Sequence, residues 1–301
     1  MKRRFVTLDV FTNRKLSGNP LAVILDAQGL DDATMQAIAN EFNLSETVFV
    51  LPDEEERQRA VLRIFTPARE LPFAGHPTVG TAFLLASLDL EGRSGEAAFG
   101  LLEKVGIINC AVSVESENAG FAQFRLPRLS QRWGEGKSKA ECAWALGLEP
   151  RDIGFENHEP SRYGAGSAFD LVPIASLEAL AKATTNSVAF DEVFSDSNHP
   201  AAYLYCRDGD PSGKRFRARM FGLARGIIED PATGSAVAAL SGALMQFEPM
   251  GDGDHIFTIG QGFEMGRPSE ISLKIRLKQG AMDFAEIGGY AVIVGRGELQ
   301  V

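Results

Sequence analysis

The sequence has few of the residues that build metal sites or disulfide frameworks. Its 301 residues include four histidines and three cysteines. The cysteines are odd in number and widely spaced, and no two form a CxxC pair, so neither a disulfide framework nor a zinc site is indicated. They are Cys110, Cys142 and Cys206. His158, His199 and His255 lie in polar stretches without HxH or HxxxH spacing, so we expect them at the surface and predict no metal site.

Positive charge and long apolar runs are also scarce. The chain has 30 Lys and Arg against 40 Asp and Glu, a net charge of −10. This argues against a nucleic-acid partner or an anionic membrane, which favour a basic face. It does not exclude an anionic substrate, because local donors decide such binding. No apolar run reaches the ~18 residues of a membrane span, and strand-like residues follow the basic Met1–Phe5 at once. We therefore expect no signal peptide and a cytoplasmic protein.

Several catalytic motifs are missing as well. The sequence has no GxxxxGK[ST] phosphate loop, no GxSxG nucleophile turn and no HExxH zinc helix. Gly260–Gly266 superficially resembles a dinucleotide-binding loop, but the residues after it favour a strand where that fold requires a helix. The sequence therefore predicts no cofactor.

What the sequence does contain is a repeated turn. Asp230–Ala236 (DPATGSA) aligns without gaps to His76–Ala82 (HPTVGTA) at an offset of 154, the difference between 76 and 230. His76 then faces Asp230. This offset is about half of the 301 residues. A turn that repeats at half the chain length predicts two similar domains.

The helices that follow the two turns are apolar or small nearly all the way round. We expect them at about Pro77–Leu88 and at Pro231–Phe247. A helix without a polar stripe is buried on every side, and these two are too short to span a membrane. Because the flanking segments favour strands, the sequence predicts an α+β fold in which each half is a curled sheet around one helix.

The remaining elements follow from periodicity and turn residues. Further helices are expected after a cap at Asp31 or Asp32, and at Ala140–Leu148 and Ser176–Ala183. Strands are expected at Phe5–Phe11, Leu21–Leu25, Thr47–Leu51, Val61–Phe65, Val105–Val114, Phe121–Leu126, Ala168–Ile174, Ala201–Cys206, Arg215–Phe221, His255–Ile259, Ile271–Leu277 and Phe284–Val294, the last broken at Gly288-Gly289.

The starts of the two helices offer groups that can bind an anionic ligand. A helix N-terminus presents unpaired N–H groups and a partial positive charge, and glycine there lets a ligand approach the backbone. Two such starts facing across a cleft would bind carboxylates. The alternative is that Asp230 and Ser235 only cap a helix, the usual role of these residue types. The repeat favours a shared site, because the turn is kept while His76 and Asp230 differ.

Short motifs along nearly the whole chain resemble the phenazine-biosynthesis PhzF-like family. They are Leu8–Thr12, Gly18–Pro20, Leu44–Thr47, Phe65–Pro67, Gly75–Thr78, Glu229–Ala236, Gln261-Gly262 and Met265–Pro268. The resemblance implies a diaminopimelate-epimerase-like fold. Two pseudo-symmetric halves, each a curled, mostly antiparallel sheet around a central buried helix, would enclose the active site in the cleft between them. We expect domains at 1–117 with 287–301 and at 118–286, and the resemblance also implies a homodimer.

The resemblance implies roles for individual residues. Glu46 matches the glutamate that moves protons in members that catalyse isomerisation. His76 and Asp230 match a polar pair that contacts the substrate, and we expect them to assist the proton transfer. The positions that hold the substrate through hydroxyl groups and backbone amides are Ser45, Gly75, Gly234 and Ser235.

One departure from the wider superfamily excludes one kind of reaction for this chain. Its amino-acid epimerases use two cysteines, one at each helix start, and the corresponding positions here are Ala74 and Ala232. Inversion at a carbon needs a base on one face and an acid on the other. Epimerisation by two thiols is therefore not available to this chain.

These observations predict an isomerase that acts on a small carboxylate without a cofactor. Glu46 would remove a proton from a carbon beside an unsaturated or carboxyl-bearing centre and deliver one to another carbon on the same face. Two alternatives stay open. One is an amino- or imino-acid racemase, epimerase or dehydratase on the same scaffold, and the other is a non-catalytic protein that binds a small ligand.

Overall fold

The structure is a computed structural model that describes residues 2–185, 187–194, 201–222 and 227–301. They form two compact units, Met1–Pro127 with Ile287–Val301, and Arg128–Glu286. The first unit extends past the boundary expected at 117, because a strand at Ala119–Arg125 pairs with the strand before it. No helix in the described part of the chain is long and apolar enough to cross a membrane.

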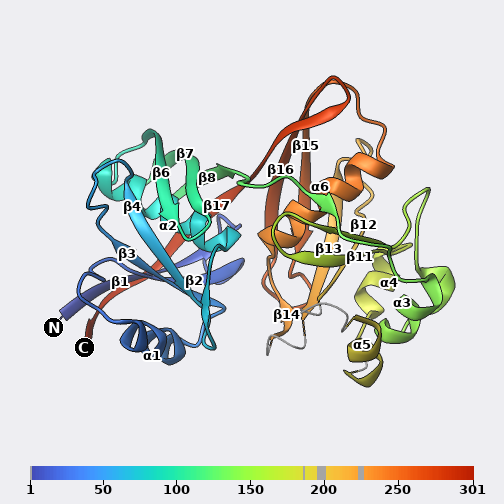
Figure 1. Cartoon of the computed structure of the whole chain (residues 1–301), viewed down its shortest axis with the longest axis horizontal. Helices are drawn as coiled ribbons and strands as arrows, with labels where there is room; N and C mark the ends of the chain where they lie inside the picture. Colours follow the sequence, from blue (N-terminus) through green and yellow to red (C-terminus); the bar gives the residue numbers. More distant parts are fainter. Residues whose placement is uncertain (1, 186, 195–200, 223–226) are drawn as a thin grey trace. The chain divides into compact units, whose positions relative to one another are not determined.

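The first unit is a closed sheet around one helix (Figure 1). Its elements are β1 (Lys2–Val10), β2 (Asn19–Ile24), α1 (Asp32–Phe42), β3 (Glu46–Leu51), β4 (Ala60–Phe65), β5 (Glu70–Leu71), α2 (Gly75–Asp89), β6 (Gly95–Glu103), β7 (Gly106–Ser116), β8 (Ala119–Arg125) and the later part of β17 (Ala281–Gln300). β2 is parallel to β3 and β4 to β6. β1 is antiparallel to β2, β3 to β4, and β7 to both β6 and β8. Because β17 pairs with both β1 and β8, the sheet closes on itself.

Helix α2 fills the inside of this sheet. Every residue from Gly75 to Ser87 is buried, and strands β1, β2, β3, β7 and β8 all contact the helix. At Gly80 a side chain could not fit, since a Cβ would lie 2.7 Å from the side chains of both Val10 and Leu21. The expectation of a helix that is buried on every side is confirmed.

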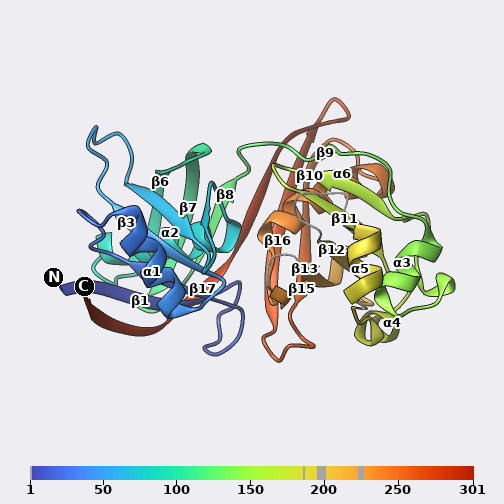
Figure 2. The same ribbon diagram turned by 60° about the horizontal axis from the view of Figure 1, so that its bottom comes forward.

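The second unit repeats this order of strands around α6 (Gly234–Phe247). Its other elements are β9 (Gln131–Arg132), α3 (Lys139–Leu146), η1 (Pro150–Asp152), β10 (Ser161–Gly164), β11 (Ala168–Pro173), α4 (Leu177–Lys182), α5 (Ser187–Phe194), β12 (Ala202–Arg207), β13 (Arg215–Gly222), β14 (Ile227–Asp230), β15 (Gly253–Gln261) and β16 (Ser269–Lys278). β11 is parallel to β12 and β13 to β15, as β2 is to β3 and β4 to β6. Figure 2 shows α3, α4 and α5 together beside β11 and β12, where their apolar side chains share one core.

The two units also share a matched ion pair. Arg63 of β4 donates from Nε and Nη2 to the carboxylate of Glu70 in β5, at 2.8 and 2.7 Å. Arg219 of β13 donates from the same two atoms to Glu229 in β14, at 2.8 and 2.9 Å. Both pairs join the strand before the central helix to the short strand that leads into it.

This correspondence corrects the alignment of the repeat. Gly75 is the first residue of α2 and Gly234 the first of α6, an offset of 159 (234 minus 75). The ungapped alignment at 154 matched His76 to Asp230, whereas the helix starts match His76 to Ser235. The 154 offset matched the prolines and glycines of the two turns, Pro77 with Pro231 and Gly80 with Gly234, although these residues hold different positions relative to the helix starts.

Some element boundaries were wrong. α2 begins at Gly75, so Pro77 is its third residue rather than its first, a position whose N–H would have no helical acceptor in any case. α6 begins at Gly234 and not at Pro231. β17 runs unbroken through Gly288, where a Cβ would lie 2.7 Å from Gln123, so this glycine permits close packing instead of ending the strand.

Candidate functional site

The predicted base and its neighbour come together at the start of α2. Glu46 is the first residue of β3 and His76 the second residue of α2. Their atoms Oε2 and Nε2 lie 3.3 Å apart, although not in the alignment of a regular hydrogen bond. The His76 side chain is 6% exposed and that of Glu46 15%. Ser45 and Gly75 precede the two residues in the chain, which gathers every site residue predicted for this unit at one end of α2.

Burial decides the charge of His76. It lowers the pKa of the imidazole from 6.5 to about 3, so the ring is neutral at neutral pH. The contact with Glu46 is therefore one between a neutral imidazole and a carboxyl group and not a salt bridge. A neutral imidazole has one N–H donor and one acceptor nitrogen, so His76 carries no charge that would attract the Glu46 carboxylate.

We expect the ring resonances of His76 to stay unchanged between pH 5 and 8 in NMR spectra, and His76→Gln to remove them. Between its unfolded pKa of 6.5 and its folded pKa of about 3, the unfolded chain binds the extra proton. The stability that His76 contributes is complete above pH 6.5 and is lost as the pH falls toward 3. The glutamine variant should lack this part of the pH–stability profile. A midpoint near pH 6.5 for the His76 resonances would contradict the prediction.

The two central helices begin differently from α1, α3 and α4. The residues before them, Ala74 and Thr233, make no side-chain capping bond. In α1, α3 and α4 the capping side chain accepts a backbone N–H; these caps are Asp31, Ser138 and Ser176. The side chains directly before α2 and α6 therefore do not cap these helices. The first N–H groups of a helix have no acceptor within the helix, so a ligand could bind there.

A dense hydrogen-bond network surrounds the start of α6. Asp230, the last residue of β14, accepts the Thr233 hydroxyl at Oδ2, at 2.6 Å. Gln261 lies behind both residues and is completely buried. Gly234 and Ser235 form the first two positions of the helix; the glycine is buried and the serine half-buried. The structure thus gathers the three predicted residues of this unit in one turn.

Comparison with known proteins identifies the family to which this chain belongs. The family model described as "Phenazine biosynthesis-like protein" matches residues 8–297. The chain belongs to the phenazine biosynthesis-like (PhzF) family. An uncharacterized isomerase of Mesorhizobium japonicum is 45% identical over 300 residues, covering 99% of this chain and 98% of the relative. The trans-2,3-dihydro-3-hydroxyanthranilate isomerase of Pseudomonas fluorescens is 34% identical over 301 residues, covering 98% of each.

Solved structures show the same fold. A phenazine biosynthesis protein of the PhzF family from Bacillus anthracis superposes with a TM-score of 0.86 at 26% identity, covering 100% of both chains. The expected diaminopimelate-epimerase-like fold, with two similar halves each built around a buried helix, is confirmed. Because these two full-length relatives are named isomerases, this PhzF-family chain is an isomerase.

The PhzF-family chain has no thiol at either helix start. Ala74 lies directly before α2, and Ala232 lies two residues before Gly234, the first residue of α6. The three cysteines are buried as free thiols, and burial raises the pKa of each to about 12. A thiol of that pKa is a poor base at neutral pH. Thiol chemistry at the helix starts is therefore excluded.

One histidine of this family member is not where we expected it. His158 is buried, with Nδ1 3.0 Å from the Tyr205 hydroxyl and Nε2 3.0 Å from Glu248 Oε1. Its partners are 47 and 90 residues away in the sequence, so the polar residues beside it gave no sign of burial. His255 lies in β15 and is half-exposed. His199 lies outside the described residues.

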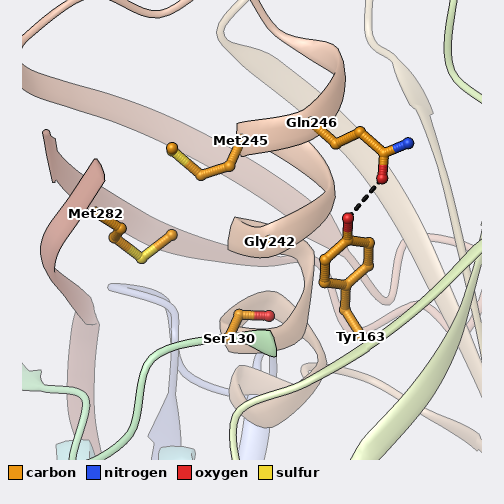
Figure 3. Close-up of a pocket in the computed structure, with 6 residues that line it drawn as sticks. All are labelled: Ser130, Tyr163, Gly242, Met245, Gln246 and Met282. Atoms are coloured by element: carbon orange, nitrogen blue, oxygen red, sulfur yellow. Dashed lines mark hydrogen bonds between the residues drawn. The ribbon is translucent and has the colours of Figure 1, made fainter. Parts of the chain in front are cut away.

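A separate pocket lies in the second unit of this PhzF-family protein (Figure 3). Its volume is about 350 Å³, and its lining consists of Ser130, Tyr163, Gly242, Met245, Gln246 and Met282. The Tyr163 hydroxyl donates to Gln246 Oε1 at 2.5 Å. The pocket contains none of the predicted site residues and no pair of groups suited to proton transfer. The candidate site therefore stays at the helix starts.

Proposed function

We propose that this protein is an isomerase that moves a proton between two carbons of a small unsaturated carboxylate, with Glu46 as the acid and base. The observation that carries the proposal is the 3.3 Å contact between Glu46 and the neutral His76 at the start of α2. The 34% identity to a trans-2,3-dihydro-3-hydroxyanthranilate isomerase over nearly the full length supports a substrate of that kind.

The reaction needs only one base. The Glu46 carboxylate takes a proton from a carbon beside the double bond, and the electron pair left behind spreads over the neighbouring unsaturated carbons. The carboxylic acid then returns a proton to the far end of that system, the double bond moves, and no atom is gained or lost. His76, whose Nε2 lies 3.3 Å from Glu46 Oε2, would assist the transfer as a neutral neighbour of the carboxyl group. A single carboxylate implies that both protons move on one face of the substrate.

The helix starts would hold the substrate. The first N–H groups of α2 and α6 have no helical acceptor and carry partial positive charge. Gly75 and Gly234 let a substrate carboxylate approach them closely. Ser45 in the first unit, and Asp230 and Ser235 in the second, would orient polar substituents of a substrate. Donors in these positions also stabilise the negative charge that develops when the proton leaves.

Proton NMR in D₂O would test the reaction. Trans-2,3-dihydro-3-hydroxyanthranilate and a panel of small unsaturated carboxylates are incubated with the protein, and samples without protein serve as the control. Migration of a double bond with one deuteron at the receiving carbon would support the proposal. Deuterium confined to an α-carbon, without migration, would indicate a racemase instead. Binding without exchange or rearrangement for any member of the panel would favour the non-catalytic alternative.

Two finer expectations belong to this proposal. The family resemblance implies a homodimer, and the sequence led us to expect a cytoplasmic protein. Light scattering on the purified protein tests the first, since a dimer would have twice the chain mass of 32.5 kDa. A mass equal to that of one chain would refute it.

A further inference from the structure

The correspondence between the units identifies two equivalent buried residues that the proposed reaction does not use. β6 and β15 each follow the central helix, each has nine residues, and each runs parallel to the strand before the helix. Their last residues are Glu103 and Gln261. Both are buried, and both reach back to the start of the helix that precedes them.

Gln261 uses all four hydrogen-bonding positions of its amide. Oε1 accepts the Thr233 N–H and the Tyr203 hydroxyl, each at 3.1 Å. Nε2 donates to the Asp230 carbonyl at 2.7 Å and to the Thr233 hydroxyl at 2.9 Å. The backbone N–H can only donate and the carbonyl can only accept, which determines which way the amide points. Because the Thr233 hydroxyl donates in turn to Asp230 Oδ2, Gln261 orients the Asp230 carboxylate.

Glu103 also contacts a threonine in the first unit, but Thr78 is the fourth residue of α2, whereas Thr233 directly precedes α6. The Thr78 hydroxyl oxygen lies 2.7 Å from the Ala74 carbonyl and 2.7 Å from Glu103 Oε1. A hydroxyl has one proton, and the carbonyl can only accept it. The second contact is therefore a hydrogen bond only if Glu103 supplies a proton to Thr78. Glu103 then acts as a neutral carboxylic acid, which has the shape and the donor of a glutamine.

The surroundings of Glu103 agree with this protonation state. Burial raises the pKa of its carboxyl to about 8. From β7 it faces the buried Cys110 thiol, whose own pKa is about 12. From α2 it faces Thr78, with the neutral His76 two residues earlier. Lys104, next in the chain, pairs with Glu70 at 2.5 Å.

We propose that Glu103 and Gln261 are equivalent positioning residues, each a neutral hydrogen-bonding group. Glu103 fixes the first turn of α2, which bears His76, and Gln261 fixes the first turn of α6, which follows Asp230. The claim that they position catalytic groups rests on the proposed function. The claim that they hold the two turns does not. Each turn keeps its shape because a side chain from the following strand satisfies its polar groups from behind.

Amide hydrogen exchange, followed by mass spectrometry on residues 75–79 and 234–238, tests the contacts without any substrate. At pH 6, Glu103→Met should speed exchange of the α2 turn about tenfold, the effect of one lost hydrogen bond. Glu103→Gln should stay within about twofold of the wild type, because glutamine donates as the acid does. Gln261→Met should open the α6 turn alone. Glu96→Gln, an exposed change on the same strand β6, is the matched control and should alter neither turn.

A pH comparison remains informative even where a methionine variant does not fold. At pH 9, one unit above a pKa of about 8, the wild-type acid has lost its proton, so its α2 turn should exchange roughly tenfold faster than that of Glu103→Gln. At pH 6 the two should agree. Equal exchange at both pH values, or a Glu103→Gln turn that is already open at pH 6, would overturn the proposal.

The catalytic part has its own readout. With a substrate from the NMR panel, Glu103→Met and Gln261→Met should lower kcat about tenfold with little change in KM, whereas Glu103→Gln should keep the wild-type kcat at pH 6. Open turns with an unchanged kcat would overturn the positioning role. Failure to find any substrate would count against the proposed function alone, since the exchange results would stand.

Discussion

Glu46→Gln is expected to lower kcat by about 10²- to 10⁴-fold, the usual contribution of a general acid and base. Glutamine keeps the volume of the side chain and can still approach His76, but it cannot accept a proton from carbon. KM should change little, because the substrate contacts at the helix starts remain. The measurement is the initial rate of rearrangement in D₂O, together with the rate of deuterium incorporation.

The matched control is Glu41→Gln, an exposed change in α1 that removes the same charge. It should retain the wild-type rate. Thermal unfolding of both variants should resemble that of the wild type, since Glu46 begins a strand and its side chain keeps partial contact with solvent. If Glu46→Gln turns over as fast as Glu41→Gln, the proton is carried by another group and the proposed mechanism is wrong.

Glu229→Gln should destabilise the second unit by about 3 kcal/mol or more, because it leaves a buried guanidinium without its counter-charge. Arg219 is 7% exposed, and its Nη1 also donates to the carbonyls of Leu180 and Ala183 at the end of α4. The pair therefore joins β13, β14 and α4. In the variant, an amide N–H₂ would face the donors of Arg219, and the unit should melt roughly 10 °C lower.

The equivalent pair in the first unit supplies the control. Glu70→Gln removes the same kind of carboxylate, but Arg63 is 20% exposed and keeps Asp32 as a partner at 2.6 Å. We expect a loss of about 1 kcal/mol there, because solvent and the second carboxylate compensate the remaining charge. Calorimetry or denaturant unfolding of both variants decides the matter. Equal losses would show that burial of the arginine does not control the energy of these pairs.

The burial of the two central helices could be predicted from their composition, which is apolar or small on every side. Thr81–Leu88 and Ser235–Met245 lack any polar stripe, and only an enclosing sheet can bury such a helix on every side. The repeat of the turn pointed to two halves for the same reason: it is a local pattern. Only the family resemblance placed Glu46 and His76 in one site.

The features that could not be predicted from the sequence depend on contacts between residues that are far apart in the chain. Gln261 lies 28 residues beyond Thr233, and Glu103 lies 25 beyond Thr78, so no local periodicity connects them. The strand β6 was not predicted because its glycines and small residues weaken the strand pattern of Gly95–Glu103. Short elements such as β14 were missed because a few residues give too little pattern to recognise.

The last strand has a consequence for the order in which the chain can fold. The second unit is one continuous segment, Arg128–Glu286, whereas the first needs Ile287–Val301 to complete it. Until these residues leave the ribosome, β1 and β8 are open edges, since β17 is the strand that joins them. The half that is synthesised first is therefore the half that closes last, and open edges are where nascent chains associate wrongly. The segment Ile287–Val301, which the proposed reaction does not use, thus completes the fold of the newly made protein.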